Sequence, residues 1–191
     1  MIFCLEKEST RASSLSDIRE INMNYGTIKN YDIANGPGCR ISLFVSGCRN
    51  KCKGCFQPET WDFTYGQEFT DETLLELLRA LDNPHIRGLS ILGGDPFEEE
   101  NRDTVLGICY AVKERFGDTK DIWVWTGYYW EDLRDLAVFD HIDVLVDGPF
   151  MESEKSLSIW YRGSRNQRVI DIPLSKKHNC AIRWKGDGKW K

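Results

Sequence analysis

Three of the seven cysteines in this 191-residue chain lie close together, in the spacing C-x3-C-x2-C. Cys48, Cys52 and Cys55 fall within SGCRNKCKGCF, whose glycines and polar residues predict a loop. Thiolates this close can bind one metal centre, and iron-sulfur clusters are held by cysteine thiolates. A four-iron cluster usually takes four cysteines, so three would leave one position open to a substrate. Zinc and unliganded thiols are the alternatives, but His85, the nearest histidine, lies beyond a predicted helix.

The other four cysteines have simpler interpretations. Cys109 lies on the apolar stripe of a predicted helix and Cys39 begins a predicted strand, so both are expected to pack as small hydrophobic residues. Cys4 and Cys180 lie in weakly patterned ends and are interpreted as incidental thiols. The odd count and the lack of a secretory signal argue against a disulfide framework and for the reducing cytoplasm.

Composition narrows the class of protein. Hydrophobic residues make up 41% of the chain and charged residues 29%, which is typical of a folded domain. The net charge of -5 lacks the basic excess that nucleic-acid binding requires, so we expect no nucleic-acid partner. No apolar run approaches the roughly 18 residues that cross a bilayer, so we expect no membrane association.

Predicted strands and helices alternate along the chain. The turn signal at 35–38 separates two strands that should pair, and Leu74, Leu77, Leu78 and Leu81 recur at helical spacing behind Thr70, a candidate N-cap. Hydrophobic patterns predict strands at 25–34, 39–45, 89–92, 122–125 and 142–146, and helices at 70–81, 105–116 and 130–137.

Such alternation predicts an α/β fold with mostly parallel strands. About four such strands are too few for a closed barrel, so an open sheet or partial (β/α) barrel is expected. The loops that follow the four strands carry the three cysteines, Gly93 to Pro96, residues 126–128 and residues 147–149, in that order. These loops should meet at the carboxyl end of the sheet, where parallel α/β folds bind their ligands. Asp147 is interpreted either as lying near a bound ligand or as a turn residue at a strand end.

The chain divides into three predicted parts. Residues 1–22 have no sustained hydrophobic period and are expected to be a flexible arm that the protein can lose, with Met23 as a candidate natural start. Residues 23–172 form the main domain. Alternation at 168–172 and 180–184 predicts a small C-terminal β extension, so 173–191 would hold a hairpin strand and a tail.

The cysteine spacing followed by Gly93-Gly94-Asp95-Pro96 resembles the radical S-adenosylmethionine superfamily. NGPG at 35–38, LFVSGC at 43–48, DIWVWTGY at 121–128, DVLVDG at 143–148 and RGS-NQ within 162–167 narrow the resemblance to activating proteins of anaerobic ribonucleoside-triphosphate reductase. The fold that this resemblance implies is a partial, open barrel of the radical S-adenosylmethionine type.

The resemblance also implies a mechanism. Cys48, Cys52 and Cys55 would bind three irons of one 4Fe-4S cluster, and the fourth iron would chelate S-adenosylmethionine. One electron, from reduced flavodoxin or a similar donor, would cleave this cofactor into methionine and a 5′-deoxyadenosyl radical. The radical would remove a hydrogen atom from a glycine in a loop of the large reductase subunit, which makes the chain an oxidoreductase.

Further residues are implied as contacts of S-adenosylmethionine. The backbone of Gly93 and Gly94, or the Asp95 carboxylate, would accept hydrogen bonds from its ammonium group. Gly54, Cys55 and Phe56 would line its nucleotide side, with Phe56 near the adenine.

Two questions stay open at the level of the residues. Arg49, Lys51 and Lys53 either offset the thiolate charge or solvate the loop. The alternative functions are activation of another glycyl-radical enzyme, a different radical S-adenosylmethionine reaction, and an iron-sulfur electron-transfer module, which normally has four ligands.

Overall fold

The computed structural model describes residues 23–186, so the predicted arm at 1–22 and the tail from residue 187 lie outside the described residues. One seven-stranded sheet has the order β3-β1-β2-β4-β5-β6-β7. Its strands are β1 (Asn24–Asp32), β2 (Cys39–Val45), β3 (Gln67–Glu68), β4 (Ile86–Gly93), β5 (Asp121–Trp125), β6 (Val144–Asp147) and β7 (Arg168–Asp171). The central strands β2, β4, β5 and β6 are parallel, and the outer pairings are antiparallel. The prediction of an open α/β sheet is confirmed.

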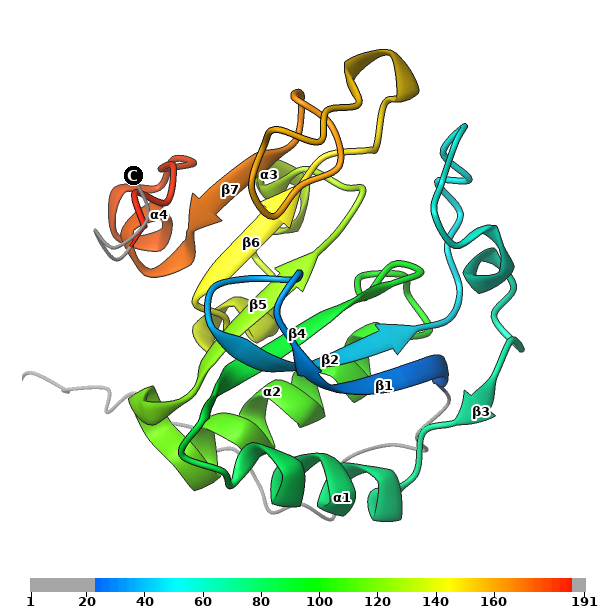
Figure 1. The fold of residues 1–191 in the computed structure, drawn as a ribbon. Coiled ribbons are helices and arrows are strands. Elements are labelled where there is room, and N and C mark those ends of the chain that lie inside the picture. Colours follow the sequence, from blue (N-terminus) through cyan, green and yellow to red (C-terminus); the bar gives the residue numbers. More distant parts are fainter. Residues whose placement is uncertain (1–22, 187–191) are drawn as a thin grey trace, which may run out of the picture.

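Helices cover one face of this sheet (Figure 1). They include α1 (Asp71–Leu81), α2 (Arg102–Phe116) and α3 (Trp130–Leu133). Alternate side chains of each strand point toward them, as Ile41, Leu43 and Val45 of β2 do in the main hydrophobic core. Helix α1 begins where predicted, because the hydroxyl of Thr70 accepts a hydrogen bond from the backbone N–H of Thr73. None of the helices within residues 23–186 is long and apolar enough to span a membrane.

Loops rather than helices lie over the opposite face. Trp123, Val144 and Val146 form a second, smaller cluster there, and Tyr161 and Trp184 pack against it. Tyr161 belongs to the long connection 148–167 between β6 and β7, which rises beside the carboxyl ends of the strands in Figure 1. Loop residues therefore complete the packing on this face.

The C-terminal extension was predicted to form a hairpin or edge strands, and β7 is an edge strand of the sheet. Strand β7 pairs antiparallel with β6 and so belongs to the main sheet. The connection after it is helix α4 (Ile172–His178), because Pro173 fits the first helical turn and the Asp171 side chain accepts a hydrogen bond from the backbone N–H of Leu174. The returning segment meets β7 through one bridge, between Ile170 and Arg183. The boundary predicted at residue 172 therefore falls inside α4.

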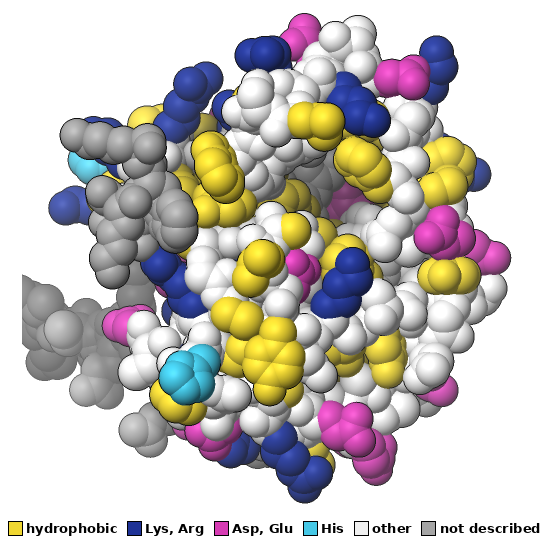
Figure 2. Space-filling view, viewed as in Figure 1, with side chains coloured by type: hydrophobic (Ala, Val, Ile, Leu, Met, Phe, Trp, Pro, Cys, Tyr) yellow, Lys and Arg dark blue, Asp and Glu magenta, His cyan; other side chains and the backbone are white. Residues whose placement is uncertain are grey.

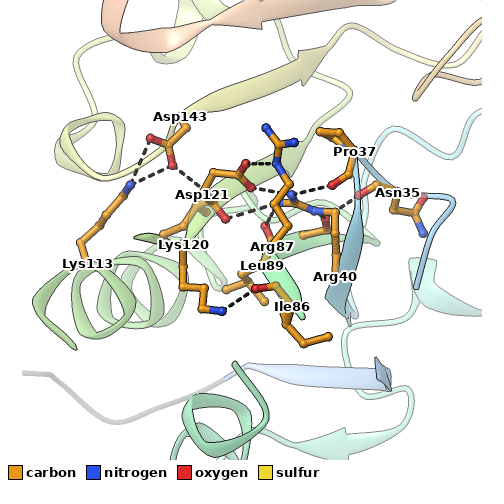
Figure 3. A network of polar contacts seen from close by, with 12 residues as sticks. Asn35, Pro37, Arg40, Ile86, Arg87, Leu89, Lys113, Lys120, Asp121 and Asp143 are labelled. Atoms are coloured by element: carbon orange, nitrogen blue, oxygen red, sulfur yellow. Dashed lines mark hydrogen bonds and ion pairs between the residues drawn. The ribbon is translucent and has the colours of Figure 1, made fainter. Parts of the chain in front are cut away.

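A buried guanidinium group holds together the amino ends of the parallel strands (Figure 3). Arg40, on β2, is fully buried and donates hydrogen bonds to Ser90 Oγ and to the Leu89 carbonyl oxygen, both at 2.7 Å. It also forms an ion pair of 2.5 Å with Asp121, which begins β5 and accepts a further hydrogen bond from Arg87 at 2.9 Å. A buried cation is costly without such partners, so this pair fixes β2, β4 and β5 relative to one another.

We expect Asp121→Ala to lower the free energy of unfolding by about 3 kcal/mol, because it leaves the Arg40 guanidinium buried without its carboxylate. Urea denaturation followed by circular dichroism measures the change. Asp118→Ala, at an exposed carboxylate three residues earlier, is the matched control and should change stability by less than about 0.5 kcal/mol. Equal stability of the two variants would contradict the importance of the pair.

Candidate functional site

The loop that follows β2 brings the three cysteines to the carboxyl end of the sheet (Figure 1). Cys48, Cys52 and Cys55 are partly exposed and border one hollow of about 690 Å³. Figure 2 shows a hollow on this face with apolar side chains around its edge. The loops after β4, β5 and β6 add Gly93, Gly94, Asp95, Thr126, Gly127 and Gly148 to its wall. The prediction that these loops meet at one end of the sheet is confirmed.

The three thiols border the hollow without converging on one point. Within residues 23–186, no group of three histidine, cysteine or acidic residues is close enough to hold a single metal ion. A tetrahedral zinc site needs ligands that converge on one ion, whereas the cysteines of a four-iron cluster bind different irons. Cysteines that border one hollow suit a four-iron cluster, because its thiolates bind different irons.

The remaining described cysteines lie away from the hollow. Cys109 is buried in the main core and Cys39 packs against that core, as predicted. Cys180 is exposed, and Cys4 lies outside the described residues.

Burial governs the protonation of the cysteine thiols. It raises the pKa of Cys48 to about 11, an effect to which the negative charge of Asp95 adds. Burial also raises the pKa of Cys52. Both thiols are therefore protonated at neutral pH, and a metal centre has to displace their protons when it binds.

Two of the three cations beside the cysteines are paired with carboxylates. Arg49 forms ion pairs with Glu98 at 2.7 Å and Glu100 at 2.5 Å, and Lys53 Nζ lies 3.2 Å from a carboxylate oxygen of Glu152. The backbone N–H of Arg49 also donates a hydrogen bond of 2.6 Å to Glu98, which is buried. Arg49 therefore anchors the cysteine loop to the loop after β4, and its charge is already balanced there.

Asp95 connects three loops through one buried carboxylate. Its Oδ1 accepts hydrogen bonds from the backbone N–H of Phe97 at 3.0 Å and the hydroxyl of Thr126 at 2.8 Å. Its Oδ2 accepts from the side-chain amide of Asn50 at 3.1 Å and the backbone N–H of Gly127 at 2.8 Å. Burial raises the pKa of Asp95 to about 6, against the effect of these hydrogen bonds, so the group is ionised at neutral pH.

These four hydrogen bonds give Asp95 a structural role. A carboxylate has about four acceptor positions, and donors from the protein already use four. Asp95 borders the hollow, where it was expected to accept a hydrogen bond from a cofactor ammonium group, and it also joins the cysteine loop to the loops after β4 and β5. The backbone of Gly93 and Gly94 still borders the hollow.

Glycine is required at positions 93 and 94 by contacts within the protein. Gly93 has φ of +110°, and a Cβ atom there would lie 2.7 Å from the carbonyl oxygen of Val45. A Cβ atom at Gly94 would lie 2.5 Å from the carbonyl oxygen of Gly47, the residue before Cys48. Both distances are too short for a real side chain. The glycine pair thus lets the loop after β4 pack directly against the start of the cysteine loop.

Gly54 and Phe56 lie differently from one another. Phe56 borders the hollow and is largely exposed. Its ring centre lies 5.8 Å from that of Phe150 and 5.1 Å from Lys155 Nζ. Gly54 is not among the residues that border the hollow. A Cβ atom there would lie 3.1 Å from Glu152, so Gly54 instead allows the cysteine loop to approach the connection 148–167.

Residues 148–167 form a second wall that the predicted site residues did not include. Phe150, Tyr161 and Arg162 border the hollow from this side. Gln167 braces the segment, because its side chain accepts a hydrogen bond from the backbone N–H of Gly163 at 2.9 Å and donates one to the carbonyl oxygen of Gly148 at 3.1 Å. The RGS-NQ motif was the sequence signal for this wall.

Asp147 is a structural residue at the end of β6. It is fully buried and accepts hydrogen bonds from Arg168 Nε and from the backbone N–H of Trp130, both at 2.9 Å. It does not border the hollow. Of its two interpretations, the strand-end one is supported.

Comparisons with known proteins agree with this site. Residues 34–170 match the family model of a 4Fe-4S single cluster domain. An anaerobic ribonucleoside-triphosphate reductase-activating protein of Enterobacteria phage T4 is 44% identical over 147 residues, 77% of this chain and 93% of the phage protein. A protein of the same name from Vibrio cholerae is 43% identical over 80% of this chain and 100% of its own length. The corresponding protein of Escherichia coli K12 is 41% identical over 77% of this chain and 97% of its own length.

Asp95→Asn should destabilise the three-loop junction, because either orientation of the new amide turns its NH₂ group toward a backbone N–H, of Phe97 or of Gly127. We expect a loss of about 1–3 kcal/mol in unfolding free energy and less iron per chain after anaerobic reconstitution. Glu99→Gln, at an exposed neighbour, is the control. An Asp95→Asn protein with the stability and iron content of this control would show that the carboxylate is dispensable.

Proposed function

The chain belongs to the family of anaerobic ribonucleoside-triphosphate reductase-activating proteins, and we propose that it generates the glycyl radical of such a reductase at the hollow beside Cys48, Cys52 and Cys55. The observation that carries this proposal is the meeting of three cysteines and a glycine pair at the carboxyl end of a parallel sheet. The 4Fe-4S family model and the names of the relatives agree with it.

When bound, a 4Fe-4S cluster and S-adenosylmethionine would supply the redox chemistry, namely one-electron cleavage of a carbon-sulfur bond and removal of a hydrogen atom from the reductase glycine. The protein supplies thiols, backbone acceptors and an enclosed space. In this proposal Cys48, Cys52 and Cys55 are the ligands of three irons. Their placement around one hollow supports that role.

The contacts to S-adenosylmethionine are also proposed. Gly93 and Gly94 border the hollow with exposed backbone, which suits them to accept hydrogen bonds from the ammonium group. Cys55 and Phe56 border the same hollow, and the exposed ring of Phe56 offers a surface on which an adenine can stack. Gly54 would line the nucleotide side together with these residues, and its lack of a side chain lets the cysteine loop approach Glu152.

Three features favour this function over the alternatives. An iron-sulfur electron-transfer module would normally supply four cysteines, and the described hollow has three. The relatives are activating proteins of the anaerobic reductase, which favours that partner over another glycyl-radical enzyme. The hollow at the carboxyl end of the sheet suits a segment of a large protein as substrate.

The finer expectations complete the proposal. The open sheet would be a partial barrel of the radical S-adenosylmethionine type. The electron donor would be reduced flavodoxin or a similar protein, and the site of action the anaerobic cytoplasm, without a nucleic-acid or membrane partner.

The proposed function predicts three products when the reduced, reconstituted protein is incubated with S-adenosylmethionine and the reductase. Chromatography should detect methionine and 5′-deoxyadenosine, and electron paramagnetic resonance should detect an organic radical on the reductase. Cofactor cleavage without a radical on the reductase would favour another radical reaction. Absence of cleavage under strong reduction would favour an electron-transfer module.

Cys52→Ala should lose the intact cluster and the ability to cleave S-adenosylmethionine, because it removes one of the three proposed iron ligands. Iron analysis and the visible absorption of the reconstituted protein measure cluster content, expected at about four irons per chain in the unaltered protein. Cys180→Ala, at an exposed cysteine away from the hollow, should keep both properties. Retention of a full, active cluster by Cys52→Ala would refute the ligand assignment.

A further inference from the structure

Large hydrophobic side chains are unevenly exposed on the described surface. Five of them are between 66% and 92% exposed, whereas the next, Leu75, is 50% exposed. The five are Tyr31, Ile33, Phe56, Leu157 and Trp160. Single exposed hydrophobic residues are ordinary, but a group of them beside a ligand site marks a surface that binds a partner.

All five lie on the three segments that enclose the hollow, and we call them the apolar rim. Tyr31 and Ile33 precede Ala34 and Asn35, which border the hollow from the β1–β2 connection. Phe56 borders it from the cysteine loop, and the other two rim residues belong to the connection 148–167. Apolar side chains surround the hollow on the face shown in Figure 2. One rim residue, Phe56, therefore borders the hollow, and the other four belong to segments that contribute residues to its wall.

Backbone strain is found in the same segments. Tyr31 and Tyr161 both have φ of +62°, a conformation that bulky residues rarely adopt. Tyr31 is itself in the rim, and Tyr161 follows Trp160 and borders the hollow. Strained residues persist where the surrounding structure holds them, and they concentrate at ligand-binding and switch regions. Both strained tyrosines therefore lie in segments that contribute residues to the wall of the hollow.

Positive charge accompanies the rim although the whole chain has a net charge of -5. Arg162 borders the hollow, and burial lowers its pKa, an effect to which the positive charges of Arg183 and Arg165 add. Among the described residues, none of the three forms an ion pair with a carboxylate. Unpaired arginines beside apolar side chains suit a partner surface that carries carboxylates.

We propose that the apolar rim and the arginines beside it form the docking surface for the reductase, and that they bind a segment around its glycine which combines apolar side chains with at least one carboxylate. This inference rests on the proposed function, because the glycine has to reach the hollow beside the rim. The relatives that this chain resembles are named as activating proteins of the anaerobic reductase. The reductase is therefore the occupant.

The test measures the affinity of the reconstituted protein for the reductase by biolayer interferometry. Leu157→Ser and Trp160→Ala together should weaken binding at least about tenfold, as expected when central apolar contacts are truncated. Leu75→Ser, at the next most exposed hydrophobic residue, on α1, is the matched control and should change the affinity less than about twofold. Leu157→Ser alone, at the most exposed of these side chains, guards against a folding defect in the double variant.

Charge reversal tests the arginines separately. Arg165→Glu combined with Arg183→Glu, both at exposed positions, should weaken binding and reduce its dependence on salt concentration. Sedimentation velocity should show the free protein as a monomer at the same concentrations, and a rim-dependent dimer would overturn the choice of partner.

Cleavage of S-adenosylmethionine in the absence of reductase distinguishes a failure of the docking surface from a failure of the proposed function. The variants at Leu157, Trp160, Arg165 and Arg183 should cleave it at the rate of the unaltered protein while leaving less radical on the reductase. Unchanged affinity of the rim variants, with normal radical formation, would overturn the docking surface alone. If the unaltered protein cleaves S-adenosylmethionine but leaves no radical on the reductase, the proposed function is wrong and the docking surface with it.

Discussion

The site depends on one buried carboxylate that accepts hydrogen bonds from three loops. Asp95 receives donors from its own loop, from Asn50 in the cysteine loop and from the Thr126-Gly127 turn after β5. A buried charge without partners would be strongly unfavourable, so the folded chain must bring these loops together to satisfy it. The requirement places Cys48 next to the glycine pair and sets the inner wall of the hollow.

The other end of the sheet uses the same principle with the opposite charge. Arg40 is fully buried and is satisfied by Asp121, Ser90 and the Leu89 carbonyl, so β2, β4 and β5 are joined at their amino ends (Figure 3). The two polar clusters hold the parallel strands at both ends. Helices cover one face between them, and the loops of the opposite face remain available for a ligand and a partner.

The sequence predicted the parts of this structure that follow from local patterns. Hydrophobic spacing located α1 with its Thr70 cap and the central parallel strands, and the cysteine spacing predicted the loop that borders the hollow. Hydrogen bonds and ion pairs between segments distant in the sequence were not predictable in this way. The partners of Asp95 and Arg40 come from segments distant in the chain, so their spacing leaves no local signal. Helix α4 was missed because apolar alternation on both sides of it suggested a hairpin.

The central claim is that the hollow beside the three cysteines is where a hydrogen atom passes from the reductase glycine to the nucleotide. Reductase labelled with deuterium at the glycine α-carbon tests it most directly, with mass spectrometry of the 5′-deoxyadenosine formed by the reduced protein. Deuterium in that product is the predicted result. Unlabelled 5′-deoxyadenosine from a reaction that has placed the radical on the reductase would contradict direct transfer at this site.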